Sequence, residues 1–179
     1  MGYTLPMMNR ILVPLCACLL LAACPAASRS TRSAEGPRLP REAVTLDFED
    51  VTTGKEVSTQ RFRGKPVILF FFTTWCTPCQ LEAERLHQVH AAAGRDRVAI
   101  LGICIDLDRR LVPPFVEAAG FNFPVVYGDP GLVRSSPLGP VQGVPRIVIL
   151  DAAGRPVVDL PRPVDGRTIF EALKPYLGR

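Results

Sequence analysis

Two cysteines separated by two residues are the strongest chemical feature of the sequence. Cys76 and Cys79 lie in the segment Trp75-Cys76-Thr77-Pro78-Cys79, where a predicted strand ends and a predicted helix begins. Unpaired backbone N–H groups at a helix N-terminus stabilise a thiolate on the first cysteine of such a pair. We expect the exposed thiolate of Cys76 to attack a disulfide, and the shielded thiol of Cys79 to resolve the mixed disulfide.

The small loop that this disulfide would close favours exchange over a structural role. Chain-entropy arithmetic gives a four-residue loop only about 2 kcal/mol of stabilisation, against about 3 kcal/mol for a 15-residue loop. A structural zinc site is the alternative use of a cysteine pair, but zinc normally needs a second pair of ligands. Only Cys104, His87 and His90 are available for that purpose, so we expect no metal.

Alternating strands and helices must position these cysteines. The run Pro66–Thr73 is continuously apolar, as in a central strand covered on both faces. The segment Pro78–Ala93 places Leu81, Leu86 and Val89 on one helical stripe, which we expect to be buried. Further strands are predicted at 43–48, 56–59, 97–105, 123–126, 146–150 and 156–160, and further helices at 110–119 and 165–177. This order predicts a three-layer α/β domain with a mixed sheet.

The composition excludes several other classes of protein. The chain has 179 residues, of which 47% are hydrophobic and 21% are charged, as in a folded globular protein. The net charge of +4 is small and scattered, so we expect no nucleic-acid partner. No glycine-rich phosphate-binding motif is present. No apolar stretch reaches the 18 or so residues that a membrane-spanning helix requires.

The first residues have the pattern of an export signal. Arg10 is followed by the apolar run Ile11–Ala23, which is too short to span a bilayer of about 30 Å and is typical of a secretory signal peptide. The end of this run, Leu21-Ala22-Ala23-Cys24, resembles the bacterial lipobox. That resemblance implies removal of residues 1–23 and attachment of lipid to Cys24. An ordinary signal peptide with a chance cysteine is the alternative.

A low-complexity segment separates this signal from the domain. Residues 25–41 are rich in Ala, Ser, Arg and Pro and show no helical or strand periodicity. We therefore expect a flexible tether, with an ordered arm lying on the domain as the alternative. The predicted organisation is a signal peptide at 1–23, the lipidated cysteine and tether at 24–41, and one domain at 42–179.

Two separated motifs give the domain a specific resemblance. The segment Asp47–Cys79, with Gly54-Lys55, Gly64-Lys65 and the W-C-x-P-C sequence, resembles the opening of the TlpA/ResA-like thioredoxin-fold thiol–disulfide oxidoreductases. The similarity continues to Gly143-Val144-Pro145 and covers about residues 44–177. It implies a thioredoxin-like fold, with three α/β/α layers, a central mixed sheet and an N-terminal β-hairpin extension. It also implies that the enzyme needs no cofactor beyond the Cys76–Cys79 disulfide.

The resemblance assigns roles to individual residues. Cys76 attacks, Cys79 resolves, and Pro145 is preceded by a cis peptide bond and faces the disulfide. Glu82 matches an acid that relays a proton to or from the second thiol, although a solvated glutamate on the helix surface is the alternative. Arg146 stands where relatives usually carry Thr, and a cation there would favour a thiolate and an acidic partner. The residues expected to face a partner are Trp75, Thr77, Pro78, Val144 and Arg146.

The function implied by the resemblance is reduction of protein disulfides outside the cytoplasm. The expected enzyme is a monomer, tethered to the membrane by lipid and supplied by a membrane dithiol electron donor. Cysteines of apocytochrome c or of copper sites are typical clients of relatives. Cys104 is expected to be a buried small apolar residue. The loop Gly128–Gln142, rich in Pro, Gly and Ser, either shapes specificity or only connects two elements.

Two alternatives belong to other functional classes. A peroxiredoxin-like peroxidase would need a Pro-x-x-x-Thr/Ser-x-x-Cys arrangement, and Thr73 satisfies part of it, but Leu69 occupies the proline position. A copper chaperone would use the two thiols as soft ligands for Cu(I). No methionine-rich segment supports copper binding.

Overall fold

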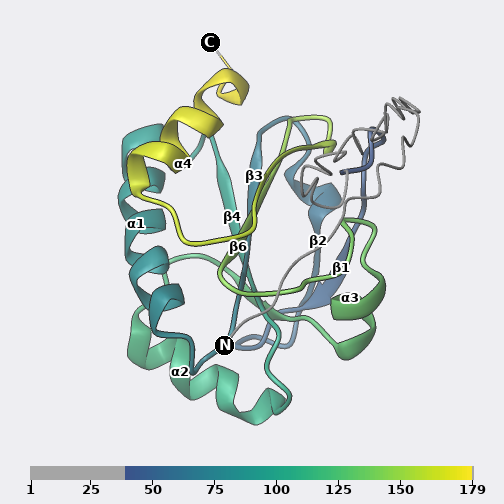
Figure 1. Ribbon diagram of the computed structural model, residues 1–179, viewed down its shortest axis with the longest axis vertical. Helices are drawn as coiled ribbons and strands as arrows, with labels where there is room; N and C mark the ends of the chain where they lie inside the picture. Colours follow the sequence, from purple (N-terminus) through teal and green to yellow (C-terminus); the bar gives the residue numbers. More distant parts are fainter. Residues whose placement is uncertain (1–38, 179) are drawn as a thin grey trace, which may run out of the picture. The chain divides into compact units, whose positions relative to one another are not determined.

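A five-stranded mixed sheet forms the centre of residues 39–178, the part of the chain that the computed structural model describes (Figure 1). Its strands, in spatial order, are β5 (Val125–Tyr127), β4 (Ala99–Cys104), β3 (Val67–Phe72), β6 (Arg146–Leu150) and β7 (Pro156–Leu160). Strands β3, β4 and β5 are parallel, whereas β6 and β7 run antiparallel to their neighbours. The predicted mixed sheet is confirmed. The predicted signal peptide, Cys24 and most of the tether lie outside the described residues.

Strand β3 occupies the centre because both of its faces are apolar. All six of its side chains are buried, as expected for a strand covered on both sides. Alternate residues enter different cores, since successive side chains of a strand point to opposite faces. Phe70 and Phe72 belong to one core, and Leu69 and Phe71 belong to the other.

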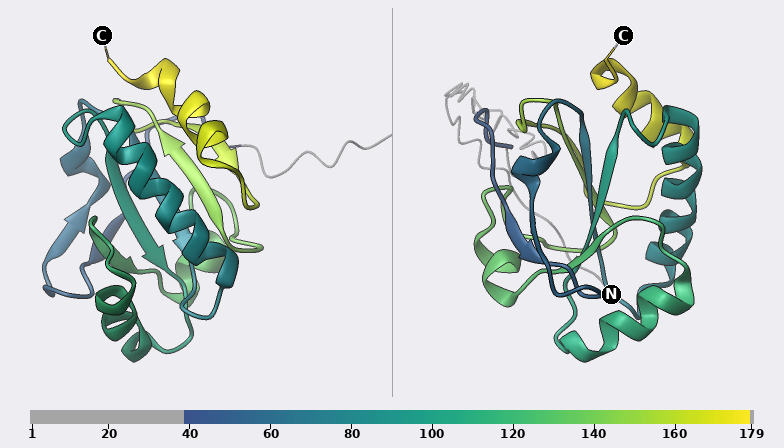
Figure 2. Two further views of the ribbon diagram at one scale, coloured as in Figure 1. Left: turned by 90° about the vertical axis from the view of Figure 1, so that its left-hand side faces the viewer. Right: turned by 180° about the vertical axis from the view of Figure 1, so that it is seen from behind.

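Each face of the sheet has its own covering layer. One face is covered by α1 (Thr77–Ala93), α2 (Val112–Ala119) and α4 (Gly166–Leu173). The opposite face is covered by the hairpin of β1 (Asp47–Glu49) and β2 (Glu56–Ser58) and by α3 (Pro130–Ser135). Figure 2 shows the hairpin and α3 on the far side of the sheet from α1 and α4. The three layers and the N-terminal hairpin therefore agree with the prediction. Short 3-10 turns lie at Thr59–Phe62, Arg109–Leu111 and Lys174–Tyr176.

Helix α1 buries two of the three residues of the predicted stripe, Leu86 and Val89, but not Leu81. Leu81 is 59% exposed, whereas Cys79, Glu82, Leu86 and Val89 are buried. Positions three and four residues apart share a helix face, and the row that starts at Cys79 passes through Glu82. The prediction that Leu81 is buried is wrong, because Leu81 lies outside the row of buried positions that runs from Cys79 through Glu82 and Leu86 to Val89.

A short helix interrupts the segment that was expected to be a loop. Helix α3 lies within 128–142, and the carboxylate of Asp129 caps it by accepting the Leu132 N–H at 2.8 Å. Pro130 occupies its first turn, where a missing N–H costs nothing. The partly buried side chains of Leu132 and Val133 pack against the core on the hairpin side of the sheet. The segment is therefore part of a covering layer as well as a connection.

Candidate functional site

The two cysteines of the W-C-x-P-C segment form a disulfide at the junction of β3 and α1. Their sulfurs are 2.07 Å apart and their Cα atoms 5.2 Å apart. Cys76 is the N-cap of α1, and its sulfur accepts the Cys79 N–H at 3.2 Å. The first cysteine therefore already receives one of the backbone donors that would stabilise a thiolate after reduction.

Cys79 is shielded as predicted, whereas Cys76 is more deeply buried than the sequence indicates. Cys76 is only 5% exposed and Cys79 only 2%, so the expectation of an exposed Cys76 is wrong. Trp75 and the loop that precedes Pro145 enclose the site, and the Trp75 side chain itself is 74% exposed. A partner sulfur must therefore reach Cys76 through a groove.

That groove has a volume of about 550 Å³ and brings together most of the predicted partner-facing residues. Its walls are formed by Thr73, Trp75, Cys76, Thr77 and Pro78 on the segment around the disulfide, and by Ile105, Val141, Gln142, Gly143 and Val144. The Val144–Pro145 peptide bond is cis, as the resemblance implies. Val144 and Cys76 line the same groove, although 68 positions of sequence separate them. An extended peptide in the groove would pass the disulfide.

Glu82 lies inside the protein rather than on the helix surface. Its side chain is fully buried, so the solvated-surface alternative is wrong. One carboxylate oxygen accepts from Arg85 Nη1 at 3.0 Å, and the other accepts the Val164 N–H at 3.3 Å. Burial raises the pKa of Glu82, while the hydrogen bonds from Arg85 and Val164 act in the opposite direction. Sequence reasoning did not identify Arg85 or Val164 as partners of this acid.

Arg146 is directed away from the groove and is fully engaged. Its side chain is 3% exposed, and Nε and Nη2 donate to the two carboxylate oxygens of Asp159 at 2.9 and 2.8 Å. Nη2 also donates to the Leu138 carbonyl at 2.7 Å, and the guanidinium lies 5.7 Å from the centre of the Phe71 ring. Because its charge is paired, Arg146 does not supply the unpaired cation that the sequence predicts beside the disulfide.

A buried acid that sequence reasoning missed holds the loop before Trp75. Asp106 lies two residues after the end of β4, and its Oδ2 accepts the Thr74 N–H at 2.8 Å and the Cys104 S–H at 3.3 Å. Burial raises the pKa of Cys104 to about 12, so this cysteine stays a thiol. The expectation that Cys104 is a buried apolar residue is confirmed. The available signal for Asp106 was its position, since parallel strands β3 and β4 end at the same edge of the sheet.

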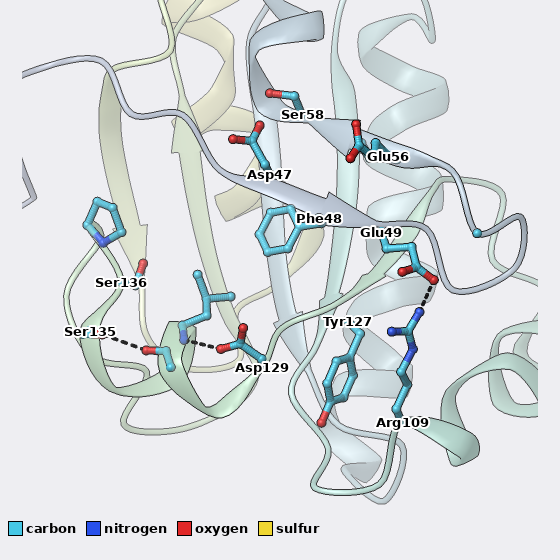
Figure 3. A pocket seen from close by; sticks show the side chains of 15 residues that line it. Asp47, Phe48, Glu49, Glu56, Ser58, Arg109, Tyr127, Asp129, Ser135 and Ser136 are labelled. Carbon is cyan, nitrogen blue, oxygen red and sulfur yellow. Dashed lines mark hydrogen bonds and ion pairs between the residues drawn. The ribbon is translucent and has the colours of Figure 1, made fainter.

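A cavity larger than this groove lies elsewhere (Figure 3). It has a volume of about 1110 Å³, lies between the β1–β2 hairpin and α3, and shares no residue with the groove at the disulfide. An ion pair between Glu49 and Arg109 spans one part of it, and Asp129 is engaged with the first turn of α3. Within residues 39–178, no cluster of His, Cys, Asp and Glu is suited to a metal ion. Over the same range, no helix has the length and apolar character needed to span a membrane.

Comparisons with known proteins identify relatives of this chain. The model of the AhpC/TSA family matches residues 41–136. The thiol-disulfide oxidoreductase ResA of Bacillus cereus is 26% identical over 151 residues, which cover 84% of this chain and 80% of the relative.

Solved structures show the same fold. A thiol:disulfide interchange protein of the thioredoxin family from Chlorobium tepidum has a TM-score of 0.66 at 25% identity, covering 80% of this chain and 100% of that protein. A secreted thiol-disulfide isomerase from Corynebacterium glutamicum has a TM-score of 0.68 at 26% identity, covering 75% of this chain and 84% of that one. The fold is thioredoxin-like.

Proposed function

The chain belongs to the AhpC/TSA family and is a thiol–disulfide oxidoreductase, and we propose that it reduces protein disulfides outside the cytoplasm with its Cys76–Cys79 pair. The observation that carries this proposal is the position of the disulfide. It lies at the N-terminus of α1 and opens into a groove that also contains Val144. The reduced form would present a stabilised thiolate to a client segment lying in that groove.

The reaction consists of two exchanges that transfer two electrons to the client. The Cys76 thiolate forms a bond to one client sulfur, the client disulfide breaks, and the other client sulfur leaves as a thiolate. Cys79 then loses its proton and attacks the Cys76 sulfur, which re-forms the Cys76–Cys79 bond and releases the first client sulfur. A donor dithiol restores the reduced enzyme by the same two exchanges in reverse. No other cofactor takes part.

The residues of the groove have distinct roles in this proposal. Trp75, Thr77 and Pro78 contact the client on the side of the attacking sulfur, and Val144 contacts the extended client segment on the other side, where Pro145 fixes the turn. Glu82 exchanges a proton with Cys79, one helical turn away. Arg146 acts indirectly, because it holds the Leu138 carbonyl and thus the segment that leads to the groove.

The sequence supports a location outside the cytoplasmic membrane. We assign residues 1–23 to a signal peptide, Cys24 to lipid attachment, and residues 25–41 to a tether of roughly 20–25 Å as a random coil. The domain would then work as a monomer close to a membrane dithiol donor, in the periplasm or on the outer face of the cell membrane. Haem-binding cysteines of apocytochrome c and cysteines of copper sites are the proposed clients.

Substitution of the attacking cysteine tests the proposal. Reduction of insulin disulfides by the chain should be abolished in Cys76→Ser, whereas Cys79→Ser should accumulate a mixed disulfide with the substrate. Cys104→Ala is the matched control, because this thiol is buried, lines no part of the groove and should leave turnover intact. Turnover retained by Cys76→Ser would contradict the mechanism.

Peroxide reduction is a second candidate function. Thr73 lies three residues before Cys76 and lines the groove, and its buried hydroxyl has no hydrogen-bond partner within the described residues. Against it, Leu69 stands in the proline position of the peroxidase pattern and is buried in β3. Hydrogen peroxide consumption that depends on Cys76, at a rate exceeding reduction of insulin, would favour this candidate.

A further inference from the structure

Three groups form a closed arrangement of hydrogen bonds beneath the disulfide. Arg85 Nη1 donates to the Glu82 carboxylate at 3.0 Å and to the Val164 carbonyl at 2.9 Å. The Val164 N–H donates to the other Glu82 oxygen at 3.3 Å. Glu82 and Arg85 are one turn apart on α1, whereas Val164 belongs to the connection between β7 and α4. We call this arrangement the Arg85 clamp.

The clamp opposes the effect of burial on the Glu82 carboxyl group. An ionised carboxyl group without a partner is very unfavourable inside a protein, and such a group takes up a proton instead. The charged groups that face Glu82 are Arg85 from α1 and Asp165 from the start of α4. Asp165 favours the protonated form of Glu82, so Arg85 is the one cation among these groups that opposes both Asp165 and burial.

Glu82 is placed to serve the second cysteine. Cys79 and Glu82 occupy positions three residues apart on the buried face of α1, where side chains are neighbours with Cβ atoms about 5–6 Å apart. Resolution of a mixed disulfide requires Cys79 to lose a proton, and a carboxylate that is already protonated cannot accept it.

We propose that Arg85 is a positioning residue for thiol exchange, which holds Glu82 ionised and oriented so that Glu82 can take the proton of Cys79. The inference rests on the proposed function and extends it to a residue that touches neither sulfur. In the step itself, the S–H bond of Cys79 breaks and its proton passes to Glu82. The new Cys79 thiolate attacks Cys76, and the client thiolate leaves with the electron pair of the mixed disulfide. Glu82 returns the proton when the dithiol is regenerated.

The hydrogen bonds of the Arg85 clamp would be the same if Arg85 served only to stabilise the fold. Arg85 also connects α1 to the β7–α4 connection, so its loss lowers stability under either interpretation. Loss of Arg85 raises the pKa of Glu82 under either interpretation, because its hydrogen bond and charge lower that pKa. Only a positioning role changes the pH dependence of the resolving step. The test must therefore separate this effect from a change in stability.

The experiment uses Ellman's reagent with the fully reduced chain in a stopped-flow spectrometer. Attack by Cys76 releases a first thionitrobenzoate, and resolution by Cys79 releases a second, so the two steps appear as two phases. In Arg85→Met the acidic limb of the second phase should move to higher pH, and a displacement of one pH unit slows this phase about tenfold on that limb. The first phase should change little. Arg85→Lys should restore most of the wild-type profile.

The control and a direct titration complete the test. Arg97→Met removes another arginine that donates to a backbone carbonyl, that of Gly178, and should leave both phases unchanged. Carbon-13 NMR of the Glu82 carboxyl group, assigned with Glu82→Gln, should show its pKa increased in Arg85→Met.

A lower melting temperature for Arg85→Met with an unchanged second phase, whether or not the pKa of Glu82 moves, would overturn the proposal and leave the proposed function intact. Absence of a second phase in the wild-type chain would overturn both.

Discussion

Two ion pairs that each contain a buried side chain lie on opposite faces of the sheet, and they are built differently. Arg146 is 3% exposed and its partner Asp159 17%, whereas Glu82 is fully buried and its partner Arg85 is 36% exposed. On the hairpin side, Arg146 meets Asp159 through two parallel contacts of 2.9 and 2.8 Å and also binds a loop carbonyl. On the side of α1, Arg85 reaches Glu82 through one contact of 3.0 Å, and the second oxygen of Glu82 receives only a backbone N–H at 3.3 Å.

The difference is consistent with a structural role for the Arg146–Asp159 pair and with the proposed chemical role of the Arg85–Glu82 pair. A planar guanidinium that grips both carboxylate oxygens is the strongest and most specific form of the contact. Asp159 is held in this way, whereas Glu82 keeps a raised pKa because its partners only partly offset burial. Raised carboxyl pKa values of this kind are typical of groups that transfer protons.

The largest expected effect comes from breaking the structural pair. Arg146→Met leaves the Asp159 carboxylate without its partner, and the loss of one member of a buried pair costs about 3 kcal/mol or more. Urea denaturation should show this decrease in the free energy of unfolding. The pH profile of thiol exchange should not move. A displaced profile would mean that the two ion pairs are not independent.

Glu82→Gln should give the largest kinetic effect. Removal of a general acid–base group slows proton transfer by about 100-fold or more, so the second phase of the Ellman reaction should slow by that factor. The amide that replaces the buried carboxyl group in this variant preserves the shape of the side chain, which limits the loss of stability. Equal slowing of both phases would show instead that the substitution disturbs the whole site.

The same variant should alter the dependence of stability on pH. Because the folded-state pKa of Glu82 lies above its ordinary value of 4.5, the folded chain binds more protons than the unfolded chain between these two values. The stability contributed by the protonated carboxyl is complete below pH 4.5 and is lost as pH rises through the raised pKa. Urea titrations at several pH values should show this decrease in the wild type. Persistence of the same decrease in Glu82→Gln would assign it to another group.

Substitution of Asp106 should cause a loss of stability between those expected for Arg146→Met and Arg109→Met. Asp106→Ala leaves the Thr74 N–H without its acceptor, which costs about 1–3 kcal/mol. Asp106→Asn keeps an acceptor oxygen and should retain most of that stability. Thermal melts compare the two, and fluorescence of Trp75, the only tryptophan, reports the loop. Equal destabilisation by both variants would indicate that charge matters more than the hydrogen bond.

The smallest effect is expected at the exposed ion pair of the large cavity. Glu49 and Arg109 are each about half exposed, so water and salt screen their attraction. Arg109→Met should change the free energy of unfolding by less than about 1 kcal/mol. If Arg109→Met lowered the free energy of unfolding as much as Arg146→Met, solvent exposure would not explain the difference between these two ion pairs.

The sequence predicts the strands and the disulfide well because their signals are local. The apolar run of β3, the helix start at Pro78 and the W-C-x-P-C segment each lie within a few residues of one another. The six-residue helix α3 shows no periodicity, because it depends on one capping carboxylate and one proline.

The roles of the buried charged residues could not be predicted from local sequence signals. A glutamate in a helix usually lies at the surface, and the contact that shows otherwise joins Glu82 to Val164, 82 positions further along the chain. The ion pair of Arg146, in contrast, could have been predicted from the sequence. The predicted hairpin of 146–150 and 156–160 already brings Asp159 close to Arg146, and an acid on the neighbouring strand is a natural partner for a buried arginine.

The reduction potential of the Cys76–Cys79 pair is the most direct test of the account. It is obtained by equilibrating the chain with thiol–disulfide buffers of known potential and counting its free thiols. A reductase predicts a value near or below about −250 mV, in the range of thioredoxin. A value near about −120 mV would identify an oxidant, and failure of the pair to interconvert would contradict redox function altogether.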